Sequence, residues 1–265
     1  MTMERLQEIV HIIPLGHEID RAVRPFDLYK VNRVYILVLR EQEKYSKEMI
    51  AKQEYYTSQV LKRLKALKIP ATVIDTDMFD LLDVICKVSG IIHNELEKNN
   101  LVYVNMSSAG RLTSIGVSIA AMAKKVQVYY VNADRYSETQ DEMKQHGISI
   151  CEKSRVLVLQ NFEIALPDAW SMQILTWLFG KNLRASEVIG KLSENNVEGF
   201  TVDIGSLKRE DQRRERANQL MKLDKRYLAK LEDRGYVTRR KIGREVEISL
   251  TESGKYVACV SGMVE

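Results

Sequence analysis

The chain has 265 residues, a length typical of one large domain or of two domains of ordinary size. Hydrophobic residues make up 45% and charged residues 29% of the sequence, with 13 Gly and 4 Pro, which excludes a disordered, collagen-like or linker-dominated chain. The formal net charge is only +4, and no uncharged apolar stretch approaches the roughly 18 residues of a membrane-spanning helix.

The first half of the chain alternates short apolar runs with helical patterns. Strands that alternate with helices of this length are typical of βαβ units, and near-continuous apolar strands fit a parallel sheet covered on both faces. The sequence therefore predicts an α/β fold, a Rossmann-like, doubly wound parallel sheet with the strand order 3-2-1-4-5. In chain order, the predicted elements are strands 9–15 and 33–39, helix 43–68, strand 71–74, helix 80–98, strand 101–106, helix 112–124 and strand 126–131.

Two further strand candidates and a domain boundary follow. Segments 148–151 and 155–160 either extend the edge of the sheet or join it to the next domain. Pro167 stops one element and Asp168 can cap the next helix. We therefore expect one domain over residues 1–165 and a second over residues 166–265.

The second domain is predicted to contain three helices, a hairpin and a short last helix. The third helix is expected to end at Gly235 and to bury Leu220, Leu223, Tyr227 or Leu228, and Leu231. The predicted elements are helix 168–179, helix 184–192 with Ser186 as its candidate cap, helix 213–234 with a candidate break near Leu223, the hairpin 236–250, and a helix that opens at Thr251.

Positive charge concentrates in this second domain. Residues 1–165 carry a net charge of +1, whereas residues 208–244 alone hold 14 basic and 6 acidic side chains. Such a cluster is typical of a protein that binds nucleic acid, although the same charges can also solvate an exposed face. The expected DNA-binding residues are Lys225, Arg226 and Lys230 on the third helix and Arg239, Arg240, Lys241 and Arg244 at the hairpin tip.

Three helices followed by a basic hairpin are the arrangement of a winged helix-turn-helix, in which the last helix enters the major groove. Residues 223–258 resemble the recognition helix and wing of MarR/ArsR-like regulators. The shared pattern is Leu-Glu-x-x-Gly at residues 231–235 and Leu-Thr-x-x-Gly at residues 250–254. A module that has become a dimerisation element without binding DNA is the alternative.

Two polar loops are expected to meet at one edge of the first domain's sheet. In the predicted strand order, ligands bind outside the carboxyl ends of strands one and four. Small residues let backbone N–H groups approach a ligand, and guanidinium and hydroxyl groups suit phosphates or nucleobases. The candidate ligand-binding residues are Gly16, His17, Asp20, Arg21 and Arg24 after strand one, and Asn105, Ser107, Ser108, Ala109, Gly110 and Arg111 after strand four.

The motifs of several common cofactor sites are missing. Gly16 does not begin a GxGxxG pattern, and the chain has no GxxxxGK[ST] phosphate loop. The three cysteines, Cys86, Cys151 and Cys259, are widely spaced and form no CxxC pair, which argues against a disulfide framework or a zinc site and fits a reducing cytosol. We therefore expect no cofactor and no metal.

The combination of a sensor-like α/β domain with a winged helix resembles the CARF-domain transcriptional regulators associated with CRISPR systems, mostly archaeal. Residues 10–25 look like the first motif of that family. Residues 105–114 look like its second motif, usually an Asn-x-Thr-Gly-Gly-Thr-Lys turn, with Ser108 and Ala109 in place of the two glycines.

The resemblance implies a CARF-like ligand-sensing domain and a DNA-binding domain. It implies a homodimer that binds double-stranded DNA. From the cysteine spacing and the lack of a long apolar stretch we expect a cytoplasmic protein with no membrane attachment. The ligand would be a cyclic oligoadenylate or a related nucleotide, and the role would be transcription regulation in antiviral defence.

A ring nuclease is the alternative function, because some CARF domains cleave their cyclic ligand. That reaction requires positioning of a 2′-hydroxyl and stabilisation of charge rather than a metal. His17, Ser107, Ser108 and Arg111 are the residues that would serve, although no catalytic residue is assigned. A regulator without enzymatic activity is favoured, and an interaction module that binds no nucleic acid is the third possibility.

Overall fold

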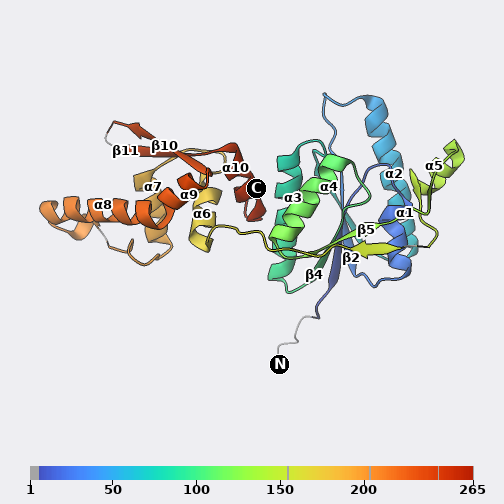
Figure 1. Cartoon of the computed structure of the whole chain (residues 1–265), viewed down its shortest axis with the longest axis horizontal. Coiled ribbons are helices and arrows are strands. Elements are labelled where there is room, and N and C mark those ends of the chain that lie inside the picture. The colour runs from blue at the N-terminus through green and yellow to red at the C-terminus, as the bar shows by residue number, and fades with distance from the viewer. Residues whose placement is uncertain (1–5, 154, 203, 244, 265) are drawn as a thin grey trace. The chain divides into compact units, whose positions relative to one another are not determined.

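The computed structural model describes residues 6–153, 155–202, 204–243 and 245–264. This part of the chain forms two compact units, the first ending at Ile164 and the second spanning Ala165–Val264. Figure 1 colours the chain from blue at the N-terminus to red at the C-terminus, so the second unit runs from yellow to red. Arg244, one of the expected DNA-binding residues, lies outside the described residues.

The first unit is built around a six-stranded sheet with the order β3-β2-β1-β4-β5-β8. Strands β1 to β5 pair in parallel, and β8 lies at one edge, antiparallel to β5. This sheet confirms the predicted doubly wound α/β fold and the order of its first five strands. The strands are β1 (Ile9–Pro14), β2 (Arg33–Leu39), β3 (Ala71–Thr76), β4 (Leu101–Asn105), β5 (Gln127–Val131) and β8 (Val156–Val158).

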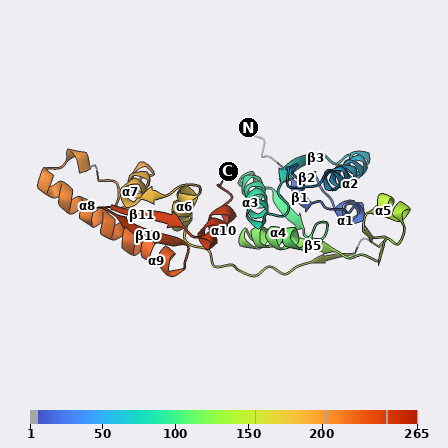
Figure 2. The same cartoon turned by 90° about the horizontal axis from the view of Figure 1, so that it is seen from above.

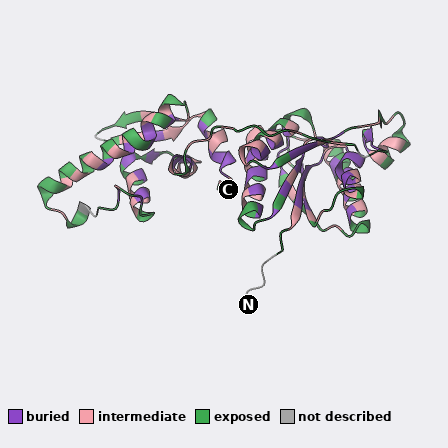
Figure 3. Ribbon diagram, turned by 60° about the horizontal axis from the view of Figure 1, so that its bottom comes forward, coloured by how far each residue is buried: buried purple, intermediate pink, exposed green. Residues whose placement is uncertain are grey.

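Helices cover both faces of this sheet because each presents an apolar side to it. Figure 1 shows α1 and α2 on one face and α3 and α4 on the other. Along α2, the side chains of Tyr56, Val60 and Leu64 recur every four residues and are buried. In Figure 3 the strands are mostly buried, whereas the outer sides of the helices are exposed. The helices are α1 (Asp20–Val23), α2 (Lys47–Ala66), α3 (Leu81–Glu97) and α4 (Arg111–Ala123).

A small lobe follows β5, and the apolar pattern of the sequence does not predict it. The lobe consists of β6 (Arg135–Tyr136), α5 (Gln140–His146) and β7 (Ser149–Ile150). The strand candidate 148–151 therefore pairs with β6 in a separate two-stranded sheet, whereas the candidate 155–160 contains the edge strand β8. α5 has no buried residue and begins at a capping box formed by Thr139 and Glu142.

The second unit is a winged helix domain, as the sequence predicts. Its core contains Ile174, Phe200, Leu223 and Ile248. Figure 2 shows the hairpin, with β11 next to α7 and β10 next to α9. The elements are α6 (Ala169–Leu178), β9 (Leu183–Arg184), α7 (Ala185–Glu194), the 3-10 turn Ile204–Ser206, α8 (Arg209–Leu223), a π-helical turn (Asp224–Leu228), α9 (Ala229–Asp233), β10 (Val237–Ile242), β11 (Glu245–Leu250) and α10 (Glu252–Val260).

Three details of the second unit differ from the sequence prediction. The N-cap of α7 is Arg184 and not Ser186. The backbone N–H of Arg184 donates to the Glu187 carboxylate at 2.6 Å. The helix does not break near Leu223 but continues through the π-helical turn. Leu220 is 44% exposed, because Gln219 (2% exposed) takes the inward position on α8.

Gly254 lies directly against the backbone of Tyr236, at the start of α10. A Cβ atom at this position would overlap the Tyr236 carbonyl oxygen, which also accepts a hydrogen bond from the Thr251 N–H at 3.0 Å. We expect Gly254→Ala to lower the free energy of unfolding of this domain by about 3 kcal/mol, the upper range for overpacking. Urea denaturation measures the change. Gly190→Ala, inside α7 where a Cβ meets nothing within 4 Å, is the control and should leave the domain equally stable or make it more stable by up to about 1 kcal/mol. Equal losses in both variants would contradict the argument.

His11 lies inside β1 and is 5% exposed. Burial lowers its pKa to about 4, whereas an unfolded histidine has a pKa of about 6.5. Between these two values the unfolded chain binds a proton that the folded chain does not, so stability falls as the pH falls through this window. Between pH 7 and pH 4 this proton costs the folded protein about 3 kcal/mol in its free energy of unfolding, and we expect His11→Phe to remove that loss. Urea denaturation of both proteins near pH 7 and pH 4 tests it, and an identical pH dependence would refute it.

Candidate functional site

A cavity of about 280 Å³ lies at the carboxyl ends of the central strands, where the connections after β1 and β4 diverge to opposite faces of the sheet. The structure brings part of the predicted ligand-binding set together here. The predicted residues that line this crevice are Gly16 and His17 after β1 and Ser108, Ala109 and Gly110 after β4.

The two loops of the crevice touch each other through their backbones. The Gly16 N–H donates to the Ser108 carbonyl oxygen at 2.7 Å, and the Ser108 hydroxyl donates to the Pro14 carbonyl oxygen at 2.9 Å. A Cβ on Gly16 would lie 3.4 Å from that Ser108 oxygen. A Cβ at that distance would make an ordinary van der Waals contact, so the two hydrogen bonds hold the loops together. The Ser108 hydroxyl is already used within the protein.

The N-terminus of α4 opens into the crevice. Ala109 and Gly110 line the cavity, and Gly110 is the N-cap of this thirteen-residue helix, with no side chain capping it. The first N–H groups of a helix lack partners within the helix and carry a partial positive charge. This end of the crevice therefore favours an anion such as a phosphate.

His17 supplies a neutral, planar group in the wall. Its ring stacks on Tyr56 with the centroids 4.9 Å apart. Burial and the nearby positive charge of Lys52 lower the pKa of His17, so the imidazole is uncharged at neutral pH. A neutral imidazole can both donate and accept a hydrogen bond.

Four predicted residues are buried and hydrogen-bonded within the protein instead of lining the crevice, and three of them, Arg21, Asn105 and Ser107, form one network. Arg21 donates to the Ser107 carbonyl oxygen at 3.2 Å and to the Tyr130 hydroxyl at 3.0 Å. Asn105 donates to the Arg21 carbonyl oxygen at 2.8 Å and accepts from the Ser107 hydroxyl at 2.6 Å. The buried carboxylate of Asp20 accepts from Arg63 at 3.0 Å. The network links the loop after β1 to the loop after β4.

The other two predicted residues, Arg24 and Arg111, do not line the cavity either, and Arg24 is half-buried. Arg24 is 3.3 Å from the carboxylate of Asp27. Arg111 is exposed at the first position of α4 and does not line the cavity.

The small lobe is attached to the loop after β1. Gly147 has a φ of +86°, and a Cβ there would lie 2.6–2.7 Å from backbone atoms of residues 17–19. The Ile148 N–H donates to the His17 carbonyl oxygen at 2.9 Å, and the Ser149 hydroxyl donates to the buried Glu18 carboxylate at 2.8 Å. This attachment places Ile148 in the wall of the crevice.

Sequence reasoning missed several wall residues, among them Ile148, Gln53 and Phe79. Gln53 is a polar residue on the buried side of α2, where its side chain donates to the Leu15 carbonyl oxygen at 3.0 Å. Phe79 follows β3 and is 57% exposed. A polar residue within an apolar helical stripe and an aromatic residue at a strand end are the signals that point to them.

In the second unit, some of the predicted DNA-binding residues are exposed, and others contact groups within the protein. Lys225, Arg240 and Lys241 are exposed. Arg226 is exposed but donates to the Glu198 carbonyl oxygen at 2.7 Å. Lys230, also exposed, lines a small cavity together with Asp168, the N-cap of α6.

Arg239 is held by carboxylates of the helix behind the wing. Its Nε donates to Glu232 at 2.9 Å, and its other nitrogens donate to Glu232 and Asp224. Its guanidinium is therefore engaged within the protein. Sequence reasoning did not single out four exposed arginines of α8, which are Arg209, Arg213, Arg214 and Arg216.

The described residues show neither a metal-binding cluster nor a helix that could span a membrane. They contain no group of three or more His, Cys, Asp or Glu side chains placed to hold a metal ion. None of their helices has both the length and the apolar character needed to cross a membrane.

Known proteins resemble this chain in sequence or in fold. The uncharacterized protein MJ1513 of Methanocaldococcus jannaschii is 26% identical over 140 residues, which are 50% of this chain and 40% of that protein. Enterococcus italicus Csm6 bound to cyclic hexa-2′-fluoro-hexa-dAMP has a TM-score of 0.40 and 9% identity, covering 86% of this chain and 58% of that one. Can2 from Sulfobacillus thermosulfidooxidans in complex with cyclic tetra-adenylate has a TM-score of 0.39 and 9% identity, covering 94% and 63%. The chain thus spans less than two thirds of the length of each.

Two family models match separate parts of the chain. Residues 9–136 match the family described as HFX_2341_N:-like, N-terminal. Residues 171–262 match the DUF6293 C-terminal winged helix domain. The two matches lie on an N-terminal domain and on a C-terminal winged helix domain, in the order expected from the sequence.

Proposed function

We propose that the protein is a cytoplasmic, ligand-responsive transcription regulator, which binds double-stranded DNA as a homodimer and senses a cyclic oligoadenylate or a related nucleotide. The observation that carries the proposal is the crevice between Gly16 and residues 108–110, built on the same chain as a basic winged helix. The choice of a cyclic oligoadenylate rests on the resemblance of residues 10–25 and 105–114 to the two CARF motifs.

The crevice offers separate places for a phosphate and for a base. The uncapped N-terminus of α4 favours a phosphate. Glu18 is the acidic residue of the wall, but its carboxylate is already bound by Arg21 at 3.3 Å and by Ser149. On another side, Phe79 packs beside Tyr45 with the ring centroids 5.5 Å apart, which gives a nucleobase an aromatic surface to stack on.

An apolar stripe on α4 supports the homodimer. Leu112, Ile115 and Ile119 are 42%, 53% and 37% exposed and share one side of the helix, at spacings of three and four residues. The same helix begins at the crevice. A second copy packed on this stripe would bring two crevices near one two-fold axis, and a symmetric ring matches such a pair because each loop is presented twice.

In the winged helix, the exposed residues Lys225, Arg240 and Lys241 are the proposed phosphate contacts, together with the exposed arginines of α8. Arg239 is proposed instead to hold the wing against the recognition helix through Glu232 and Asp224.

Ring cleavage is kept as the second candidate because of one observation. His17 lines the crevice with a lowered pKa, so a neutral imidazole is available to accept a proton from a 2′-hydroxyl. The hydroxyls of Ser107 and Ser108, in contrast, donate to Asn105 and Pro14. Any catalysis would therefore depend on His17.

One experiment tests the proposal. A duplex enriched by the protein from a random pool is titrated with the full chain, with and without cyclic tetra-adenylate, and the nucleotide is then recovered. We expect the ligand to change the dissociation constant for DNA by about tenfold, the usual range of allosteric coupling. An unchanged constant, or no binding to DNA at low salt, would overturn it. Recovery of linear fragments would establish ring cleavage, and loss of cleavage in His17→Ala would assign it to this residue.

A further inference from the structure

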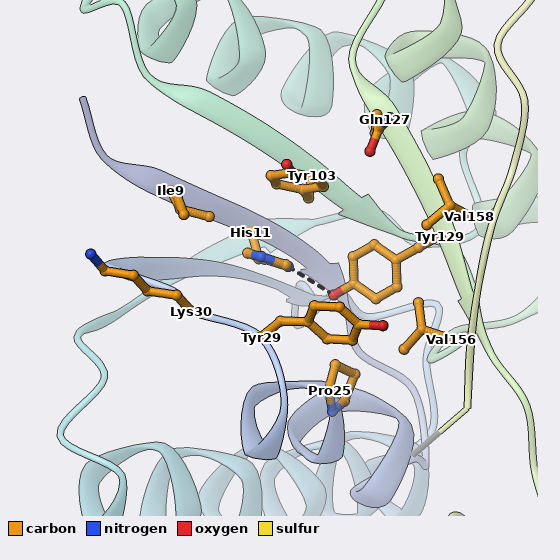
Figure 4. Close-up of a pocket in the computed structure, with 10 residues that line it drawn as sticks. All are labelled: Ile9, His11, Pro25, Tyr29, Lys30, Tyr103, Gln127, Tyr129, Val156 and Val158. Atoms are coloured by element: carbon orange, nitrogen blue, oxygen red, sulfur yellow. Dashed lines mark hydrogen bonds between the residues drawn. The ribbon is translucent and has the colours of Figure 1, made fainter. Parts of the chain in front are cut away.

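A second cavity, of about 290 Å³, lies on a face of the main sheet and shares no lining residue with the crevice. Its floor comes from β1, β4, β5 and β8, and Pro25, Tyr29 and Lys30 form the opposite side (Figure 4). The cavity exists because the first crossover is short. α1 has only four residues and passes into the 3-10 turn Arg24–Asp27, so no full helix covers this part of the sheet.

The floor of the cavity is an ordered aromatic cluster. His11 and Tyr129 are 5% and 4% exposed, and the His11 Nδ1 lies 3.0 Å from the Tyr129 hydroxyl, within hydrogen-bond distance. The His11 ring also stacks on Tyr103, with the centroids 5.1 Å apart and 18° between the planes. Burial lowers the pKa of His11 to about 4, so the floor is uncharged at neutral pH. These rings are held in place before any ligand arrives.

The rim of the cavity adds an aromatic wall and one positive charge. Tyr29 is 49% exposed, and in Figure 4 its ring lies between Pro25 and Tyr129. Lys30 lies to one side of the aromatic cluster, with its ammonium group at the end farther from the rings, and the amide of Gln127 lies beyond Tyr103. Among the described residues that line the cavity, none is acidic and Lys30 carries the charge.

We propose that this cavity binds a planar aromatic molecule that carries a negative group. The ring would pack against Tyr103, His11 and Tyr29, since aromatic rings prefer offset-stacked or edge-to-face neighbours. The anion would be attracted to the Lys30 ammonium, and the Gln127 amide would hydrogen-bond a polar edge. The volume is near the lower end of the range for small-molecule sites, which are mostly apolar with a few placed polar groups.

This cavity and the crevice share no lining residue, so a molecule bound here would contact other strands, among them the edge strand β8. Val156 and Val158 line the cavity and belong to β8, which pairs with β5 at the sheet edge. A bound ring would therefore slow amide hydrogen exchange in β8.

Binding of three aromatic anions, indole-3-acetate, benzoate and adenosine 5′-monophosphate, to the full chain tests the proposal. Saturation-transfer NMR and titration calorimetry measure it, and cyclohexaneacetate is the control with the same charge and no aromatic ring. We expect at least one aromatic anion to bind, with cyclohexaneacetate weaker by about tenfold. Tyr103→Leu should weaken binding by about tenfold, and the surface change Lys30→Gln by about fivefold.

Ala109→Glu, which alters only the crevice, should leave this binding unchanged. A loss of binding in that variant would place the probe in the crevice and overturn the proposal. Absence of binding by all three anions would also overturn it. So would an affinity in both Lys30→Gln and Tyr103→Leu that equals the affinity of the unmodified protein. A second copy of the chain is the other molecule that could fill the cavity, and sedimentation of Val158→Glu tests for it. A lower mass for this variant than for the unmodified protein, together with no binding of the probes to the unmodified protein, would assign the cavity to a second copy.

Discussion

Replacing both Arg240 and Lys241 by alanine is expected to flatten the salt dependence of DNA binding. Each phosphate that a protein neutralises adds about −0.9 to the slope of log K against log salt concentration, so the double variant should lose about 1.8. Both side chains are exposed near the end of β10, at the tip of the wing. Fluorescence anisotropy of a labelled duplex over a series of KCl concentrations measures the slope.

The control for this prediction is Lys181→Ala. Lys181 is exposed in the turn after α6 and is not part of the wing. Its removal changes the net charge without touching the proposed DNA contacts, so the slope should stay the same. A double variant with an unchanged slope would exclude the wing as a phosphate contact. A loss of about 0.9 in the control, which removes one charge instead of two, would mean that only total charge matters.

Ala109→Glu is expected to abolish stabilisation of the protein by cyclic tetra-adenylate. A ligand present at a hundred times its dissociation constant stabilises the folded state by about 2.7 kcal/mol. Ala109 lines the crevice beside the N-terminus of α4. A carboxylate there would occupy the place of the phosphate and repel it. Thermal denaturation with and without the nucleotide measures the effect.

Ala109→Gln separates charge from size in the same experiment. The glutamine side chain has the size of glutamate but no charge, so this variant should keep part of the stabilisation. Full stabilisation of Ala109→Glu would contradict the assignment of the ligand to the crevice. Complete loss in both variants would indicate that size, rather than charge, excludes the ligand.

The main elements of the fold are predictable from the sequence because each has a strong local signal. Apolar runs predict β1 to β5, and the spacing of Tyr56, Val60 and Leu64 predicts α2. The lobe lacks such a signal, since α5 buries no residue. Its capping box, Thr139 and Glu142, is the pattern from which it can be found.

The position of the crevice is also predictable, because strand order alone determines where neighbouring connections diverge. The role of each polar residue in it is not. Arg21 and Asn105 have the side chains of a phosphate or base site, but their partners come from distant segments, such as Tyr130. Sequence spacing cannot tell whether a guanidinium faces a ligand or a buried hydroxyl. Arg239 illustrates the same limit in the wing, because Asp224 lies fifteen residues away.

The π-helical turn at Asp224–Leu228 fixes how α8 is rotated relative to α9. Such a turn holds one residue more than an α-helical turn, and each residue rotates an α-helix by about 100°. Deleting one residue here would restore a regular α-helix and rotate α8 by about 100° around its own axis relative to α9. Arg213 and Arg216 would then point in a new direction, while the hairpin kept its sequence. The length of this one turn therefore sets the direction in which these arginines point relative to the hairpin.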